Sequence, residues 1–334
     1  MPVPLPSPIS VFAAARRLHG VVRHAPLTRS AALSAIAGGD VYLKRENEQV
    51  TGSFKVRGAY NVLATLGADE RERGVVASSA GNHGLGVAYA ADRLGVRATI
   101  FVPTSAPAVK RDGIRKLGAI VDDSQPDYDA AMALATRRAR ERGARFINPC
   151  LGDELLAGQG TVALEVATDL PQLASIVVPV GGGGLLGGVG GFLRPVAPQV
   201  RIAGAQSVAT AAMARSLAAG RVVEIPSVPT LADGLAGQID EEALAIGRAA
   251  LDEMVTLTEE EIAATIAFLA REEGMVVEGS GAVAAGALLH RKLAALATPA
   301  VVIVSGGNID PARHEELLRG TRTAARGGAP PPGR

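Results

Sequence analysis

The sequence has no tryptophan, one cysteine (Cys150) and almost no net charge. Aromatic side chains make up only 3% of its 334 residues, so we do not expect stacking platforms for single-stranded nucleic acid. A lone cysteine excludes an internal disulfide framework and fits a reducing cytoplasm. The 34 lysines and arginines are balanced by 33 aspartates and glutamates. We therefore expect neither nucleic acid nor an anionic membrane as a partner.

We also expect no targeting segment and no membrane-spanning segment. The N-terminal MPVPLPSPIS has no basic stretch followed by an apolar run, so it does not resemble a signal peptide. Residues 170–193 carry no charge, but eight of them are glycine and two are proline. A strand, a loop and a buried helix explain this stretch better than a transmembrane helix. We expect a cytoplasmic protein.

Short β-branched runs alternate with longer amphipathic stretches along the chain. Six runs are predicted to be strands: Val41–Lys44, Gly74–Ala77, Ala98–Val102, Ile176–Val180, Arg201–Ala205 and Ala300–Val304. Three stretches are predicted to be helices: Asp127–Arg142, Thr258–Glu273 and Gly281–Leu296. Thr258 and Glu261 have the spacing of a capping box. Strands that are apolar on both faces and separated by helices indicate an α/β fold with largely parallel sheets.

Turn-rich segments after Asn47 and at Phe146–Asp153 suggest a small domain inserted into a larger one. We place the large domain at residues 1–50 and 151–323 and the small domain at residues 51–150. The tail from residue 324, ending in GGAPPPGR, has the composition of a disordered segment.

Lys55 lies in the segment ENEQVTGSFKVRG, between a predicted strand and a predicted helix. Ser53 is placed to cap that helix, which puts Lys55 in its first turn. The positive end of a helix dipole disfavours a cation and so favours the neutral, nucleophilic form of an amine. Lys55 is therefore a candidate Schiff-base lysine, and the alternative is a solvated surface lysine.

Two further strand-to-helix turns have the composition of anion sites. SSAGNHGLG (Ser78–Gly86) offers backbone amides to a carboxylate, together with the Asn82 amide. His83 is either an acid–base group or a packed, hydrogen-bonded histidine. VGGGGLLG (Val180–Gly187) allows backbone amides to close on a phosphate.

The glycine loop has a competing interpretation. Gly182, Gly184 and Gly187 match G-x-G-x-x-G, the dinucleotide fingerprint. That fingerprint also expects an acid about 20 residues later, on the ribose, whereas this sequence has Gln206 there. We therefore favour a phosphate site over a nicotinamide site. Walker, H-E-x-x-H, C-x-x-C and G-x-S-x-G motifs are absent from the sequence.

In this order and spacing, the motifs resemble fold-type-II pyridoxal-phosphate enzymes, specifically the threonine/serine dehydratase and serine racemase group. ENEQVTGSFKVRGA is similar to the lysine motif of that group, SSAGNHGLGVA to its substrate loop and GGGGL to its phosphate loop. GQGT, ADGLAG, EGSGA and SGGNID match further stretches, over about residues 26–311. The resemblance implies two α/β domains of the kind found in the tryptophan synthase β subunit, each with a largely parallel sheet flanked by helices.

The resemblance also implies roles for individual residues. Lys55 would bind pyridoxal 5′-phosphate covalently and, once released by substrate, remove the Cα proton. The other cofactor-binding residues would be Phe54 at the ring, Asn82 at the ring hydroxyl, Ser305 at the pyridine nitrogen, and Gly181, Gly182, Gly183, Gly184 and Leu185 at the phosphate. The substrate carboxylate site would consist of Ser79, Ala80, Gly81, Asn82 and His83. A neutral serine at the ring nitrogen makes the cofactor a weaker electron sink, which favours elimination over transamination.

Two departures from the racemases narrow the expected reaction. Racemases carry a serine as the base on the opposite face, where this chain has Ala80. Their divalent-cation acids correspond to Gln206 and Ala212, which are poor ligands for a hard cation. We therefore predict no divalent metal site. Because the chain ends soon after SGGNID, we also expect no regulatory domain of the biosynthetic threonine dehydratases.

The sequence thus predicts an ammonia-lyase that converts L-threonine, L-serine or both to a 2-oxo acid and ammonia. Within the same fold, the alternatives are a hydroxyaspartate or hydroxyectoine-pathway dehydratase and a serine racemase. Outside it, the alternatives are a nicotinamide-dependent oxidoreductase and a cofactor-free binding protein. The expected partners are a small hydroxy-amino acid and, from the resemblance, a second copy of the chain in a homodimer.

Overall fold

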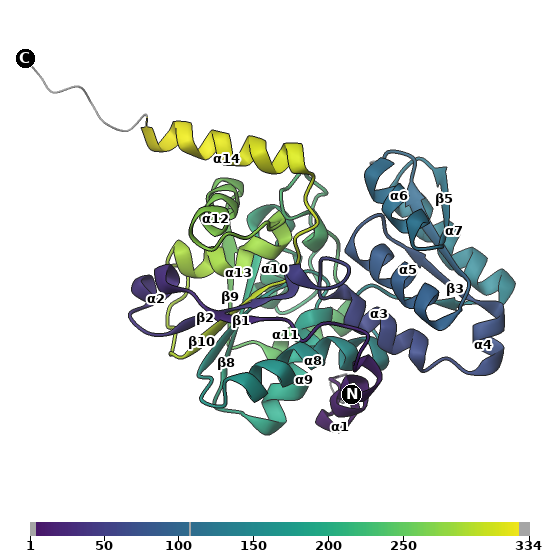
Figure 1. The fold of residues 1–334 in the computed structure, drawn as a ribbon, viewed down its shortest axis with the longest axis horizontal. Coiled ribbons are helices and arrows are strands. Elements are labelled where there is room, and N and C mark those ends of the chain that lie inside the picture. The colour runs from purple at the N-terminus through teal and green to yellow at the C-terminus, as the bar shows by residue number, and fades with distance from the viewer. Residues whose placement is uncertain (1–4, 107, 327–334) are drawn as a thin grey trace, which may run out of the picture.

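Two sheets organise the chain, which a computed structural model describes for residues 5–106 and 108–326 (Figure 1). The larger sheet has the order β1-β2-β10-β7-β8-β9 and the smaller has the order β5-β4-β3-β6. The larger comprises β1 (Leu27–Arg29), β2 (Val41–Arg45), β7 (Ser175–Pro179), β8 (Arg201–Ser207), β9 (Glu253–Leu257) and β10 (Ala300–Val304). The smaller comprises β3 (Val75–Ser78), β4 (Ala98–Pro103), β5 (Ile120–Gln125) and β6 (Arg145–Phe146).

Helices cover both sheets. Those of the smaller body are α3 (Lys55–Ala64), α4 (Ala68–Arg73), α5 (Asn82–Leu94), α6 (Ala108–Lys116) and α7 (Tyr128–Arg142). Those of the larger body are α1 (Pro8–Leu18), α2 (Ala31–Ala37), α8 (Asp153–Asp169), α9 (Gly184–Val196), α10 (Ala212–Ala219), α11 (Glu241–Ala250), α12 (Glu259–Glu272), α13 (Gly279–Leu289) and α14 (Pro311–Arg326). Short 3-10 turns are η1 (Glu46–Glu48), η2 (Val208–Thr210) and η3 (Asp233–Leu235). Figure 1 shows α3 between the two bodies.

The strand pairs are parallel, apart from β1 against β2. Helical crossovers between parallel strands bury both faces of a sheet, which explains why β7 and β10 are buried at every residue. The predicted α/β fold with two largely parallel sheets is therefore confirmed. The predicted division at residues 50 and 150 stays a prediction.

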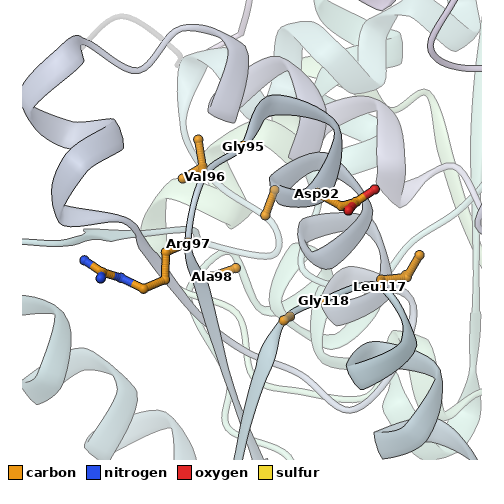
Figure 2. Close-up of a pocket in the computed structure, with 9 residues that line it drawn as sticks. Asp92, Gly95, Val96, Arg97, Ala98, Leu117 and Gly118 are labelled. Carbon is orange, nitrogen blue, oxygen red and sulfur yellow. The ribbon is translucent and has the colours of Figure 1, made fainter.

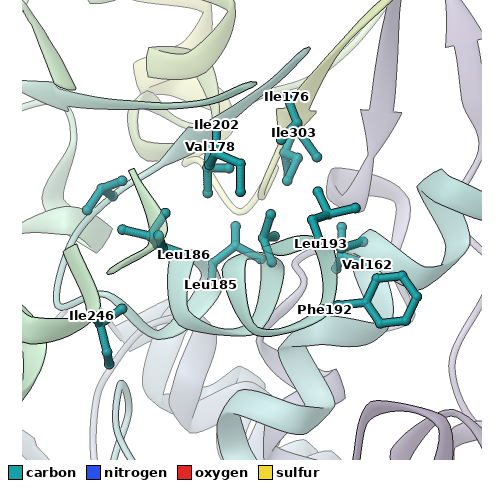
Figure 3. Packing of buried hydrophobic residues seen from close by; sticks show 14 of the residues in the cluster. Val162, Ile176, Val178, Leu185, Leu186, Phe192, Leu193, Ile202, Ile246 and Ile303 are labelled. Atoms are coloured by element: carbon teal, nitrogen blue, oxygen red, sulfur yellow. The ribbon is translucent and has the colours of Figure 1, made fainter. Parts of the chain in front are cut away.

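One core cluster of the larger body lies between its sheet and α8 and α9 (Figure 3), and a second lies between the sheet and α12 and α13. Leu186 and Leu193 of α9 pack against Val178 and Ile202 of the sheet, and burial of each such side chain contributes roughly 1.5–3 kcal/mol. The glycines of α9 serve close packing, because a Cβ on Gly188 would lie 2.4 Å from the backbone nitrogen of Gly160 in α8. No helix among the described residues is long and apolar enough to cross a membrane.

Several predicted element boundaries agree with the structure and others do not. The six predicted strands are present, and Thr258 and Glu261 form the expected capping box on α12. The predicted helix from Gly281 was wrong at its end, because α13 stops at Leu289. Helix α14 continues to Arg326, three residues into the expected disordered tail, and residues 327–334 lie outside the described residues. The sequence missed four strands, β1, β5, β6 and β9, which are short or half-exposed.

Candidate active site

Lys55 is the first residue of α3, as the sequence predicts, but the cap of that helix differs from the prediction. Ser53 was the expected N-cap, whereas the structure places Phe54 at the cap position, without a side-chain hydrogen bond. Ser53 instead pairs with Gly306 in an isolated antiparallel bridge, and the Phe54 amide donates to the Ser305 carbonyl at 3.1 Å. These backbone contacts place Lys55 beside the carboxyl end of β10.

The amine of Lys55 points to the loop that precedes α8. Its Nζ donates a 2.7 Å hydrogen bond to the carbonyl of Pro149 and lies 5.4 Å from the centroid of the Phe54 ring. The next residue in that loop, Cys150, packs against the glycine loop, since a Cβ on Gly182 would lie 2.6 Å from its Sγ. Two residues of one loop therefore connect the candidate lysine with the candidate phosphate site.

The glycine loop follows β7 and leads into the N-terminus of α9. Gly183 has a φ of +91°, which disfavours a side chain. A Cβ on Gly184 would lie 2.9 Å from the Cys150 carbonyl oxygen, and one on Gly181 would lie 3.1 Å from the Cα of Leu235. Glycine at these positions keeps the backbone amides of the helix N-terminus free of covering side chains, as an anion site requires.

Asn82 is the first residue of α5 and is held from two sides. Its Nδ2 donates to Oε1 of Glu278 at 2.6 Å, and its Oδ1 accepts a hydrogen bond from Nδ2 of Asn308 at 2.6 Å. Glu278 and Asn308 belong to EGSGA and SGGNID, which the sequence singled out without giving these two residues a role. Contacts over about 200 residues of sequence bring the three side chains together, so spacing alone offered no signal for them.

The larger body also supplies Ser305, directly after β10. Ser305 is buried, and its Oγ donates a long, 3.5 Å hydrogen bond to the Ser280 carbonyl. The Ser280 hydroxyl is buried with no hydrogen-bond partner among the described residues. The structure thus brings Lys55, Asn82, Ser305 and the glycine loop to the carboxyl ends of parallel strands, where ligands bind in α/β folds.

Comparison with protein families agrees with this geometry. Residues 18–306 match the family model described as "Pyridoxal-phosphate dependent enzyme". The chain belongs to the family of pyridoxal-phosphate dependent enzymes. Its cofactor is therefore pyridoxal 5′-phosphate, and the nicotinamide and cofactor-free alternatives are set aside.

Similar proteins and solved structures indicate which group within this family the chain resembles. It is 44% identical over 301 residues to L-threonine ammonia-lyase of Thermotoga maritima, covering 89% of this chain and 74% of the relative. It is 42% identical over 295 residues to L-threonine ammonia-lyase of Geobacter sulfurreducens, covering 88% and 73%. Its fold is similar to maize serine racemase, with a TM-score of 0.89 and 30% identity over 96% of this chain and 99% of that one. A processed threonine deaminase isoform 2 from Solanum lycopersicum gives a TM-score of 0.87 and 32% identity, covering 96% and 91%.

The residues of this pyridoxal-phosphate dependent enzyme fit the cofactor by their chemistry. The glycine loop offers amides without obstructing Cβ atoms at a helix N-terminus, where a phosphate is favoured. Two hydroxyls nearby, those of Ser53 and Ser280, are buried and have no partner among the described residues. Buried polar groups normally have partners, so these hydroxyls are consistent with a polar ligand between the two bodies.

Glu278 gives the site a group that titrates near neutrality. Burial raises its pKa to about 7, and the negative charge of Asp233 acts in the same direction. The hydrogen bond from Asn82 and the charges of Lys110 and Lys55 partly oppose this rise. The protonation state of Glu278 therefore changes over the range in which most enzymes operate.

His83 is held as a neutral, packed side chain. Its Nε2 lies 3.0 Å from the Ile147 carbonyl, to which it donates, and its Nδ1 is buried without a partner among the described residues. Burial, followed by the positive charge of Lys55, lowers its pKa to about 3. This geometry favours the packed-histidine interpretation over acid–base chemistry at Nε2.

The remaining predicted site residues lie in the turn between β3 and α5. Ser79, Ala80 and Gly81 are half-buried there, and the Ser79 hydroxyl accepts a 3.2 Å hydrogen bond from the Gly81 amide. At the positions that would bind a cation in the racemases, Gln206 is buried and its Oε1 accepts from the Ala214 amide at 3.0 Å, while Ala212 begins α10.

A cavity of about 250 Å³ lies elsewhere in the smaller body (Figure 2). It is lined by residues at the end of α5, around the start of β4 and between α6 and β5, such as Asp92, Arg97 and Leu117. Because β3 and β4 are parallel, the start of β4 is at the opposite edge of the sheet from the turn that holds Asn82. This cavity is therefore separate from the active site.

Proposed function

We propose that this protein is an ammonia-lyase that removes water from L-threonine, L-serine or both and yields a 2-oxo acid and ammonia. The observation that carries the proposal is the position of Lys55, whose amine donates to the Pro149 carbonyl in the loop that packs against the glycine loop. Ala80 lies in the turn between β3 and α5. The identity to L-threonine ammonia-lyases over most of both chains supports the same reaction.

In this proposal the cofactor is held by residues from both bodies. Lys55 would hold it covalently, the backbone amides of Gly181 to Leu185 would hold its phosphate, and Ser305 would pair with its ring nitrogen. Asn82 would donate to its ring hydroxyl oxygen through the Nδ2 hydrogen that does not bond Glu278, and Phe54 would pack near its ring. When bound, the cofactor withdraws electrons from the substrate Cα and so makes that carbon acidic.

The protein supplies binding, orientation and one base. Backbone amides of the turn at Ser79–Asn82 and the N-terminus of α5 bind the substrate carboxylate, with His83 packed beneath. The amine of Lys55 would act as the base that takes the Cα proton from one face. Ala80 cannot return a proton from the other face, which favours loss of the β-hydroxyl over racemisation.

Substrate choice within this fold depends on charge near the site. A hydroxyaspartate dehydratase would need a cation for the second carboxylate, and Lys110 is the basic residue that influences Glu278 together with Lys55. Lys110 is paired with Asp233 at 3.3 Å, so Asp233 would compete with a second substrate carboxylate for this cation. This pairing favours neutral side chains such as those of threonine and serine.

We extend the proposal to the setting of the reaction: a homodimer in the cytoplasm that needs no divalent cation. The direct test is incubation of the purified yellow protein with threonine, serine and hydroxyaspartate, followed by keto-acid detection and chiral analysis of remaining serine. We expect keto acid from threonine or serine and little D-serine. Turnover confined to hydroxyaspartate, or rapid accumulation of D-serine, would contradict the proposal.

A further inference from the structure

A cluster of four charged side chains, three of them fully buried and one partly exposed, surrounds the residue two positions after the candidate lysine. At its centre is Arg57, two residues after Lys55 and fully buried. Its Nε and Nη2 donate to the two carboxylate oxygens of Glu46 at 2.9 and 2.8 Å. Its Nη1 and Nη2 donate to the two oxygens of Glu165 at 2.6 and 2.9 Å. One guanidinium thus holds two carboxylates, each through paired hydrogen bonds.

Lys44 completes the cluster and balances its charge. Its Nζ, also fully buried, donates to Oε2 of Glu165 at 2.6 Å and to the Ala25 carbonyl at 2.7 Å. Two cations therefore pair with two carboxylates, of which Glu46 is fully buried and Glu165 is 14% exposed. The neighbouring carboxylates raise the pKa of Arg57 despite its burial, so Arg57 stays charged.

The cluster joins parts of the chain that belong to different bodies. Later residues of α3, such as Leu63, pack in the apolar core of the smaller body. Glu46 and Lys44 instead belong to η1 and β2 of the larger body, and Glu165 belongs to α8. The first turn of α3, which carries Lys55, is therefore tied to the larger body, whereas its later turns pack with the smaller one.

The close crossing of α3 and α8 also links the first turn of α3 to the larger body. A Cβ on Gly158 in α8 would lie 2.6 Å from the Cα of Gly58, so α3 and α8 approach each other at backbone distance. The Arg57–Glu165 pair lies at this crossing, and Arg57 Nη1 also donates to Thr161 of α8 at 3.1 Å. Small displacements of α3 along α8 would break these bonds together.

We propose that Arg57 is a positioning residue, which fixes the amine of Lys55 relative to the glycine loop of the larger body. It acts through the first turn of α3 and does not touch the cofactor. Buried ion clusters contribute little net stability compared with apolar residues of the same volume, so their value lies in the geometry they impose. A reacting amine needs such geometry, because a displacement of about 1 Å can slow a reaction by as much as about a hundred-fold.

This inference rests on the proposed covalent role of Lys55, and its test separates positioning from binding. Cofactor-free protein is mixed with pyridoxal 5′-phosphate, and covalent attachment to Lys55 is followed over time by borohydride trapping and peptide mapping. Affinity is measured separately with pyridoxine 5′-phosphate, which lacks the aldehyde and so reports non-covalent docking. Arg57→Lys keeps the charge but loses the paired hydrogen bonds. We expect trapping to slow by at least about ten-fold and pyridoxine 5′-phosphate affinity to change by less than about two-fold.

Two further variants guard against a general loss of folding. Glu46→Gln leaves Arg57 in place and removes one of its charged partners, and it should slow trapping in the same direction. Asp252→Asn breaks the 2.7 Å ion pair with Arg194 at the far end of α9, and it should leave trapping unchanged. Wild-type trapping rates in folded Arg57→Lys and Glu46→Gln proteins would overturn the proposal, as would an equal loss of pyridoxine 5′-phosphate affinity. Absence of label on Lys55 in the wild type would instead overturn the proposed function, and this inference with it.

Discussion

Nδ2 of Asn82 donates a 2.6 Å hydrogen bond to Oε1 of Glu278, which joins the first turn of α5 in the smaller body to the cap of α13 in the larger. Gly306 lies against the same carboxylate, since a Cβ there would lie 2.1 Å from Oε1. A side chain proposed to bind the cofactor is thus oriented by a carboxyl whose pKa is about 7. The stability of the site should therefore depend on pH.

We predict that the cofactor-free protein loses stability as pH rises through about 7. The raised pKa means that the folded state holds the Glu278 proton more tightly than the unfolded chain, for which the ordinary value is 4.5. The stabilising contribution is fully present below about pH 4.5 and is lost above about pH 7, with an upper limit on the order of 3 kcal/mol. Thermal unfolding of wild type and Glu278→Gln across this range measures it. An equally steep fall in Glu278→Gln would assign the titration to another group.

His83 should remain neutral throughout the working pH range. Its pKa of about 3 means that its contribution to stability is present above its ordinary value of 6.5 and is lost as pH falls toward 3. Replacement by phenylalanine should cost about 1–3 kcal/mol, because it leaves the Ile147 carbonyl without its donor. Glutamine, which can still donate, should retain keto-acid formation within about ten-fold. A histidine NMR titration of His83 near pH 6 would contradict the prediction.

Gly182→Ala should weaken cofactor affinity through a specific contact. The added Cβ would lie 2.6 Å from Sγ and 3.0 Å from Cβ of Cys150. Removal of the sulfur in a Gly182→Ala, Cys150→Ala double variant should therefore restore part of the affinity, as measured by pyridoxine 5′-phosphate titration. Gly183→Ala is the matched control, because its cost arises from a φ of +91°, about 1–2 kcal/mol. Truncating Cys150 should not rescue it.

Chelation of divalent cations should leave keto-acid formation unchanged. Gln206 uses its Oε1 to accept from the Ala214 amide, and Ala212 offers no side-chain ligand. Hard cations are bound most strongly by charged carboxylate oxygens, so the double variant Gln206→Glu, Ala212→Asp should gain a magnesium-dependent rise in Tm that the wild type lacks. A loss of wild-type activity in EDTA that magnesium restores would show that a cation binds elsewhere.

Local chemistry along the sequence was sufficient to predict the fold class, and the resemblance of the ordered motifs to a known family predicted the cofactor. Apolar strands such as β7 and β10 are predictable because residues buried on both faces are apolar without alternation. The glycine loop and Lys55 are predictable because a phosphate cradle and a helix-start lysine each require particular residues in a row. Half-exposed edge strands were missed, because β5, with sequence IVDDSQ, has no such pattern.

Tertiary structure decided which distant side chains act on these motifs. Ser53 loses its predicted capping role because pairing with Gly306 holds the backbone differently at that point. His83 is neutral because burial and the nearby Lys55 act on it. Glu278 meets Asn82, and Glu165 meets Arg57, across separations of 196 and 108 residues. Burial and electrostatic interactions depend on distance in space. The sequence therefore determined which titratable and polar side chains are present, and the fold determined their protonation states and orientations.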